Sequence, residues 1–197
     1  MKRRHFRRVA EVRDYRPVFI IATEGKETEP AYFRMGIFKS RERPVGVKVL
    51  NRGGGSSPDA VLDEMRKYLR GYQKKKGDEA WLVVDKDQWK TSDLELLYAW
   101  SRSDSYKNLA VSNPQFEYWL LLHFEDGKKV NNKSECLRRL RKYIPDYDKT
   151  RLPEGKFGVT RVKDATRRGK SQDSPPCTKW PGRTGTTVYR IVEKILK

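Results

Sequence analysis

The chain has 197 residues, 36% of them hydrophobic and 11% aromatic, which is enough for one packed domain with an appended lobe. Lysine and arginine number 44 against 26 acidic residues, and no apolar stretch approaches the ~18 residues that a membrane span needs. The composition therefore predicts no membrane-spanning segment, and we expect no membrane partner. The formal charge of +18 predicts a polyanionic partner or an anionic surface.

Residues 1–16 (MKRRHFRRVAEVRDYR) are predicted to form a basic N-terminal arm. This arm is either a solvated tail or a segment that lies along phosphates, with Arg7 and Arg8 as candidate nucleic-acid contacts. It has no apolar middle segment, so it does not read as a secretory signal. Cys136 and Cys177 form no CxxC pair, so we expect reduced thiols, no zinc site and a cytoplasmic location.

Residues 17–125 alternate between strand and helix patterns. The run 17–23 is continuously apolar, as in a parallel strand covered on both faces, and 45–50, 80–84 and 108–111 are the next predicted strands. Helices are predicted between them. Their expected starts are Thr28 as a cap, Ser57 before Pro58, a capping box at 92–95, and Asn113 before Pro114. This alternation predicts an α/β core with a mostly parallel sheet.

Residues 126–197 are predicted to be a C-terminal helical extension with a basic loop. Helices are expected at Ser134–Ile144 and Thr186–Leu196, and no clear strand is visible. The intervening stretch 155–182 is rich in glycine, proline and basic residues, which predicts loops or partial disorder. Its arginines are candidate nucleic-acid contacts, namely Arg161, Arg167 and Arg168.

Two apolar strands end at acidic residues. Glu24 follows the first strand, and Asp85 and Asp87 follow the third (WLVVDKD). Ligands collect at the carboxyl ends of parallel strands, so these side chains should converge if the strands are neighbours. Clustered carboxylates repel one another, and Mg²⁺ or Mn²⁺ is the cation that best offsets the repulsion. Lys86 points away from the two aspartates and is a further candidate nucleic-acid contact.

The two residues after Glu24 are candidates for contact with a phosphate. Gly25 permits a sharp turn and the close approach of a phosphate, which Lys26 would contact. The metal would polarise a phosphoryl oxygen, and Glu24 or a second metal would activate water. The plainer alternatives are that DxD is a common pattern and that Glu24 is only a turn acid. The glycines at 53–55 form either a flexible turn or a phosphate cradle.

Glu117 lies near the start of an otherwise apolar helix, PQFEYWLLLHF. A buried carboxylate is costly unless it is paired or bound to metal. Glu117 therefore either faces the acidic site or pairs with an arginine, and the sequence leaves both open. His123 ends the same helix and is interpreted as structural.

Three segments resemble one known family. IATEGKETEPAYF, VVDKDQW and SNPQFEYWLLLHF are similar, in this order, to the RloB family, also called AbiLii-like, and PDYDK and TGTTVYRIVEKIL are similar to further family segments. The resemblance implies a Rossmann-like Toprim fold. Glu24 would match the Toprim glutamate, Asp85 and Asp87 its DxD, and Glu117 the acid of NPxFExW. Gln115 stands where a small residue or cysteine is more usual.

The resemblance also implies a function. Toprim domains occur in enzymes that use Mg²⁺ on phosphodiesters, and RloB-like proteins are associated with phage defence, often beside an ABC- or AAA-type ATPase. The expected function is a metal-dependent nuclease that acts as a defence effector, with RNA such as tRNA favoured over DNA, and with homo-oligomerisation left open. The alternative is a catalytically silent nucleic-acid-binding module or a regulatory subunit of an ATPase-containing complex.

Overall fold

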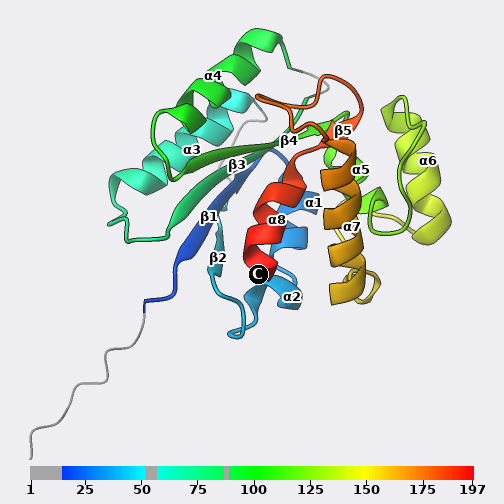
Figure 1. Cartoon of the computed structure of the whole chain (residues 1–197), viewed down its shortest axis with the longest axis horizontal. Coiled ribbons are helices and arrows are strands. Elements are labelled where there is room, and N and C mark those ends of the chain that lie inside the picture. Colours follow the sequence, from blue (N-terminus) through cyan, green and yellow to red (C-terminus); the bar gives the residue numbers. More distant parts are fainter. Residues whose placement is uncertain (1–14, 52–56, 87–88) are drawn as a thin grey trace, which may run out of the picture.

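A computed structural model describes residues 15–51, 57–86 and 89–197 of the chain. Its described part contains a five-stranded sheet with the strand order β2-β1-β3-β4-β5 (Figure 1). The first four strands in that order are parallel, and β5 pairs antiparallel to β4. The strands are β1 Val18–Thr23, β2 Gly46–Val49, β3 Glu79–Asp85, β4 Lys107–Asn113 and β5 Gly185–Thr186. The predicted α/β class with a mostly parallel sheet is confirmed.

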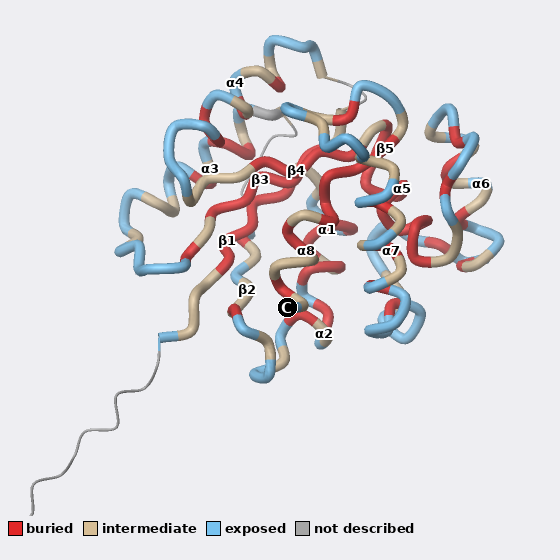
Figure 2. Tube along the Cα trace, viewed as in Figure 1, coloured by how far each residue is buried: buried red, intermediate tan, exposed pale blue. Residues whose placement is uncertain are grey.

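Helices cover both faces of this sheet, and the buried residues concentrate along the strands between them (Figure 2). The described helices are α1 Thr28–Phe33, α2 Gly36–Lys39, α3 Pro58–Arg70, α4 Thr91–Arg102, α5 Phe116–Leu121, α6 Lys133–Tyr143, η1 Glu154–Lys156, α7 Val159–Gln172 and α8 Val188–Leu196. Ile20 and Leu82 point toward α3 and α4, whereas Ile21 and Val83 point toward α1, α5 and α8. The continuous apolar runs reflect this two-sided burial.

The C-terminal part contributes directly to the sheet, which the sequence did not predict. β5 extends the sheet by two residues, and Thr187 N–H donates to the Val111 carbonyl at 2.9 Å. Helix α7 occupies part of the stretch that was predicted as loop or disorder, so that prediction is wrong for 159–172. Its buried positions, Val162, Ala165 and Gly169, recur at helical spacing between many basic residues, which mask the apolar stripe.

One predicted helix cap is confirmed by the structure. Ser57 caps α3 as predicted, because its Oγ accepts the Ala60 N–H at 3.2 Å. Helix α4 begins at Thr91 rather than at the predicted box around 92–95, with the Asp93 carboxylate accepting the Lys90 N–H at 3.2 Å. The glycines at 53–55 lie outside the described residues.

Two predicted caps make tertiary contacts instead. The Thr28 hydroxyl donates to the Lys149 carbonyl at 3.0 Å and does not cap α1. The Asn113 amide donates to the carbonyls of Pro181 and Arg183, at 3.1 and 3.0 Å, and α5 begins only after Gln115. Both side chains tie the C-terminal part to the edge of the sheet. In the described ranges, no helix has the length and apolar character required to cross a membrane.

A carboxylate cluster at the carboxyl edge of the sheet

Glu24 and Asp85 lie at the same edge of the sheet. Their strands, β1 and β3, are parallel neighbours in which Thr23 is paired with Val83, and Glu24 N–H donates to the Val83 carbonyl at 2.9 Å. Glu24 Oε2 accepts the Asp85 backbone N–H at 2.8 Å and the Trp89 indole N–H at 2.9 Å. The structure therefore brings these two acids together, as their positions after adjacent strands imply.

Glu29 is a further acid at this edge, and the sequence interpretation did not single it out. It lies in the first turn of α1 and is only 5% exposed. Its Oε1 accepts the Gly25 N–H at 3.0 Å, and a Cβ placed on residue 25 would lie 1.9 Å from its Oε2. Gly25 is thus needed for the approach of Glu29, whose carboxylate fills the space that was expected to admit a phosphate.

Glu117 completes the cluster from the first turn of α5. It is 2% exposed, and its Oε1 accepts the Tyr147 hydroxyl at 3.1 Å and lies 3.1 Å from Lys149 Nζ. Burial alone would lower the pKa of Lys149, but the charge of Glu117 outweighs it and raises that pKa. Glu117 is therefore paired with a lysine rather than an arginine, and it also acts on the neighbouring acids.

The four acids are electrostatically coupled. Burial, with added repulsion from Glu29, Glu24 and Glu117, raises the pKa of Asp85 well above its usual range, and Lys149 only partly opposes this. Burial likewise raises the pKa of Glu29 to about 7, with Glu117 and Glu24 contributing. Asp85 Oδ1 is buried and has no hydrogen-bond partner among the described residues. The edge therefore carries more negative charge than its neighbours neutralise.

This coupling predicts an unusual pH dependence of stability. An acid whose folded pKa is raised binds more protons when folded, so the free energy of unfolding falls as pH rises from about 4.5 to about 7. Glu29→Gln keeps the acceptor for Gly25 N–H and removes the charge. We expect it to increase the free energy of unfolding by about 3 kcal/mol at pH 8 and to have little effect at pH 4.

The measurement is urea unfolding of both proteins across this pH range, in EDTA. The exposed acid Glu27, three residues after Glu24, provides a matched control as Glu27→Gln. A Glu29→Gln gain that stays constant between pH 4 and pH 8 would contradict the assignment of a strained, buried carboxylate.

Tyr147 and Lys149 are the other residues that the sequence reasoning missed. They belong to the PDYDK segment, which was quoted only for its family resemblance and which lies over the cluster through contacts with Glu117 and Thr28. Burial, and then the charge of Glu117, raise the pKa of Tyr147.

Across the ranges 15–51, 57–86 and 89–197, no group of three or more His, Cys, Asp or Glu residues is gathered closely enough to hold a metal ion.

The other predicted site residues either fall outside the described ranges or lie beside the cluster. Asp87, Arg7 and Arg8 lie outside the described residues. Lys26 is exposed beside the cluster, and Lys86 Nζ lies 3.4 Å from the Pro181 carbonyl and 3.5 Å from the Gly182 carbonyl. Lys86 therefore contacts the loop that leads into β5.

The three arginines of α7 each contact another residue of the protein. The Arg161 guanidinium lies 5.1 Å from the Phe124 ring centroid, and Arg167 pairs with Asp164 at 3.2 Å. Arg168 donates to the Leu122 carbonyl at 2.6 Å, at the end of α5 opposite Glu117. The structure thus does not bring Arg168 to the acidic edge, and the role of these arginines in binding nucleic acid stays a prediction.

His123 is structural, as predicted. Its ring is buried, with Nδ1 3.0 Å from the Trp119 carbonyl and Nε2 2.9 Å from the Tyr32 hydroxyl. Burial lowers the pKa of His123 to about 3, so the imidazole is neutral at physiological pH. It holds α5 against α1 and so helps to position Glu117 relative to Glu29.

The sheet and its acidic edge define a Rossmann-like α/β protein with a carboxylate cluster at the carboxyl ends of its strands. The family model described as RloB-like protein matches residues 19–195. The chain therefore belongs to the RloB-like family, and the resemblance of its motifs is confirmed. Searches of curated proteins and of solved structures found no match.

Proposed function

We propose that this RloB-like protein is a metal-dependent nuclease that hydrolyses phosphodiesters. The observation that carries the proposal is the uncompensated charge at the edge of the sheet, where burial and mutual repulsion raise the pKa of Asp85 and its Oδ1 has no hydrogen-bond partner among the described residues. Buried charge of this kind is unfavourable unless a cation offsets it. Perturbed carboxylates at the carboxyl edge of a parallel sheet are also a frequent sign of function.

The donor set is chemically suited to Mg²⁺ or Mn²⁺, but the described acids alone are not gathered closely enough to hold an ion, so Asp87 would have to complete the site. All candidate ligands are carboxylate oxygens, which hard divalent cations prefer, and they are Glu24, Asp85, Glu117 and, by family resemblance, Asp87. A bound ion would polarise a phosphoryl oxygen and lower the pKa of a water molecule. Lys149 and the exposed Lys26 are the nearby cations that could contact a scissile phosphate.

The charge of +18 supports a nucleic-acid substrate. We favour RNA such as tRNA over DNA, because a small, broadly basic protein suits structured RNA. Family membership supports a role as the effector of an anti-phage defence system, beside an ABC- or AAA-type ATPase, in which the protein could act as a homo-oligomer.

One observation favours a second candidate, a catalytically silent nucleic-acid-binding or regulatory subunit. Lys149 Nζ already lies 3.1 Å from Glu117 Oε1, so this lysine supplies part of the positive charge that a metal ion would supply. In such a protein the lysine would neutralise the cluster permanently. The nuclease is preferred because Lys149 opposes only part of the repulsion that acts on Asp85.

The test is incubation of the protein with labelled tRNA, single-stranded RNA and duplex DNA, with Mn²⁺, with Mg²⁺ and with EDTA. Cleavage of one substrate that requires the divalent ion supports the nuclease. Binding of these substrates without cleavage under any condition, including the presence of the neighbouring ATPase, supports the silent subunit and contradicts the nuclease.

A further inference from the structure

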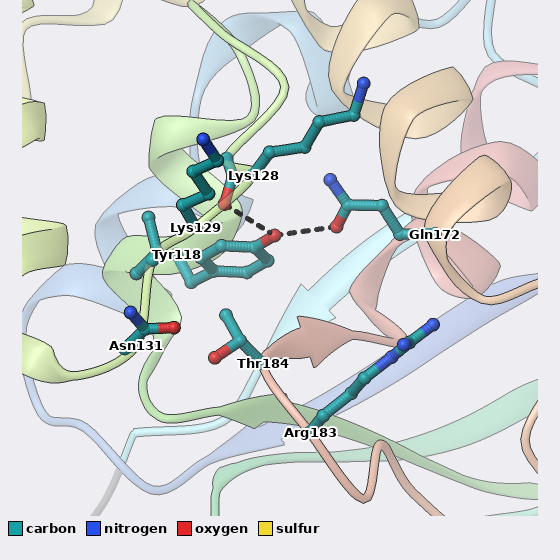
Figure 3. Close-up of a pocket in the computed structure, with 9 residues that line it drawn as sticks. Tyr118, Lys128, Lys129, Asn131, Gln172, Arg183 and Thr184 are labelled. Atoms are coloured by element: carbon teal, nitrogen blue, oxygen red, sulfur yellow. Dashed lines mark hydrogen bonds between the residues drawn. The ribbon is translucent and has the colours of Figure 1, made fainter.

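A second site candidate is a pocket that none of the acids of the carboxylate cluster lines. It has a volume of about 320 Å³ and lies between the segment after α5 and the loop that leads into β5 (Figure 3). Lys128, Lys129 and Asn131 line it from the first segment, and Arg183 and Thr184 from the second. We call it the basic pocket. Its volume lies at the lower end of the range of small-ligand sites.

Hydrogen bonds of Tyr118 join the elements that form the wall of the basic pocket. The Tyr118 hydroxyl donates to Gln172 Oε1 at 2.7 Å and lies 3.4 Å from the Gly127 carbonyl, which joins α5, α7 and the intervening loop (Figure 3). Gly127 has a φ of 66°, and a Cβ there would lie 2.8 Å from the Tyr118 hydroxyl. The loop that carries the lysines therefore packs closely against the buried Tyr118 side chain.

The rim of the basic pocket carries positive charge that the described residues do not fully neutralise. No acidic residue lines the pocket, and the side chains of Lys129 and Arg183 form no ion pair within the described residues. Lys129 also has a φ of 61°, a left-handed conformation that is unfavourable for a residue with a Cβ and that recurs at ligand sites. Lys128 differs, because it is paired with Asp126 at 3.3 Å.

Asn131 and Thr184 add free polar groups to this rim. Neither side chain makes a hydrogen bond with another residue in the part of the chain that the structure describes, and both line the pocket. An amide and a hydroxyl can donate and accept hydrogen bonds, as the edge of a nucleobase or a ribose requires.

The register of the sheet fixes how far β5, which follows Thr184 of the basic pocket, lies from Asp85. Asp85 is paired with Ser112, and Ser112 with Thr186, so Asp85 and Thr186 are two strand spacings apart, about 10 Å. Because β5 is antiparallel to β4, Thr184 lies beyond the same carboxyl edge. A nucleic-acid strand that follows this edge could reach both sites within a few nucleotides.

We propose that the basic pocket binds one nucleotide, with Lys129 and Arg183 contacting its phosphate and Asn131 and Thr184 hydrogen-bonding its nucleoside part. The ligand is a phosphate-bearing nucleotide, either free or within a single strand. Its role as a substrate subsite rests on the proposed nuclease function, whereas nucleotide binding itself does not.

The experiment measures binding in EDTA, so that hydrolysis cannot interfere. A labelled 12-nucleotide single-stranded RNA and free uridine monophosphate are titrated against the wild type and against a Lys129→Gly, Arg183→Ala double variant, in which glycine tolerates the positive φ. The control is Lys39→Ala, Arg102→Ala, which removes two exposed cations that precede the amino ends of β2 and β4.

We expect the pocket variant to weaken binding by at least about tenfold, while the control stays within about twofold. For the RNA, the slope of log affinity against log salt should fall by about 1.4, the loss of two phosphate contacts. If the pocket variant weakens the binding of uridine monophosphate alone, the pocket is a site for a free nucleotide. If it weakens the binding of the RNA, the pocket is a site for a nucleic-acid strand.

The proposal is overturned if the pocket variant matches the control with both ligands. A fold check by circular dichroism accompanies each variant, and Arg183→Lys should restore part of the affinity because it keeps the charge. Wild-type protein that never cleaves RNA but loses binding in the pocket variant would leave the pocket assigned and reject only the nuclease.

Discussion

Asp85→Asn is expected to reduce cleavage by about 10³-fold and to leave nucleic-acid binding within about twofold. The substitution removes a charge from a cluster that needs a cation, and a catalytic metal ion contributes several kcal/mol to the transition state, which corresponds to this factor. Glu24→Gln should act in the same way, although it also weakens the contacts to the Asp85 N–H and the Trp89 indole.

The measurement is single-turnover cleavage with Mn²⁺ in excess, paired with binding in EDTA. Glu27→Gln is the matched control, because Glu27 is an exposed acid in the same segment. Asp85→Asn should be at least as stable as the wild type in EDTA, since it relieves repulsion, so its lost activity cannot be attributed to unfolding. Full cleavage by Asp85→Asn would exclude Asp85 from the catalytic site.

Asp78→Ala is expected to have the largest effect on stability, about 3–5 kcal/mol. Asp78 is 3% exposed and accepts four hydrogen bonds, from the hydroxyls of Tyr15 and Tyr72 and from the N–H groups of Val18 and Lys75, at 2.6–2.8 Å. Removing a charged acceptor leaves these donors unpaired at the start of β1 and β3.

Urea unfolding at pH 7 measures this loss, with Asp63→Ala as the control. Asp63 is exposed and forms only a 3.7 Å surface pair with Arg66, so its removal should change the free energy of unfolding by less than about 0.5 kcal/mol. Burial would raise the pKa of Asp78, but its hydrogen bonds outweigh this and lower it. The part of its contribution that depends on ionisation is therefore present above pH 3.8 and is lost as pH falls through the folded pKa, so the stability difference between wild type and variant should narrow in acid.

Much of the sheet was predictable because its strands are buried on both faces. The predicted strands 17–23 and 80–84 are almost continuously apolar, a pattern typical of parallel strands, and they coincide with β1 and β3. Strand β5 and helix α7 were missed for physical reasons. Two residues of β5 carry no periodic pattern, and the buried stripe of α7 is narrow among basic residues.

The acidic edge was predictable only in part. The position of Glu24 and Asp85 after adjacent strands indicated a shared edge, which the hydrogen bond between them bears out geometrically. Glu29 was missed because an acid in the first turn of a helix is normally exposed and interacts with the helix dipole. Here the absence of a side chain at Gly25 allows Glu29 to point inward. Lys149 was missed because its pairing with Glu117 spans distant parts of the chain, which local patterns do not encode.

Mn²⁺ binding tests most directly whether the acids at the edge of the sheet hold a divalent ion. It can be measured by electron paramagnetic resonance on the protein without nucleic acid. We expect the wild type and Glu27→Gln to bind Mn²⁺ with equal affinity at pH 8 and Asp85→Asn to bind it at least about tenfold more weakly. Protonation of the cluster should weaken Mn²⁺ binding as pH falls below 7. Equal Mn²⁺ binding by wild type and Asp85→Asn, or none by the wild type, would contradict the proposed metal site.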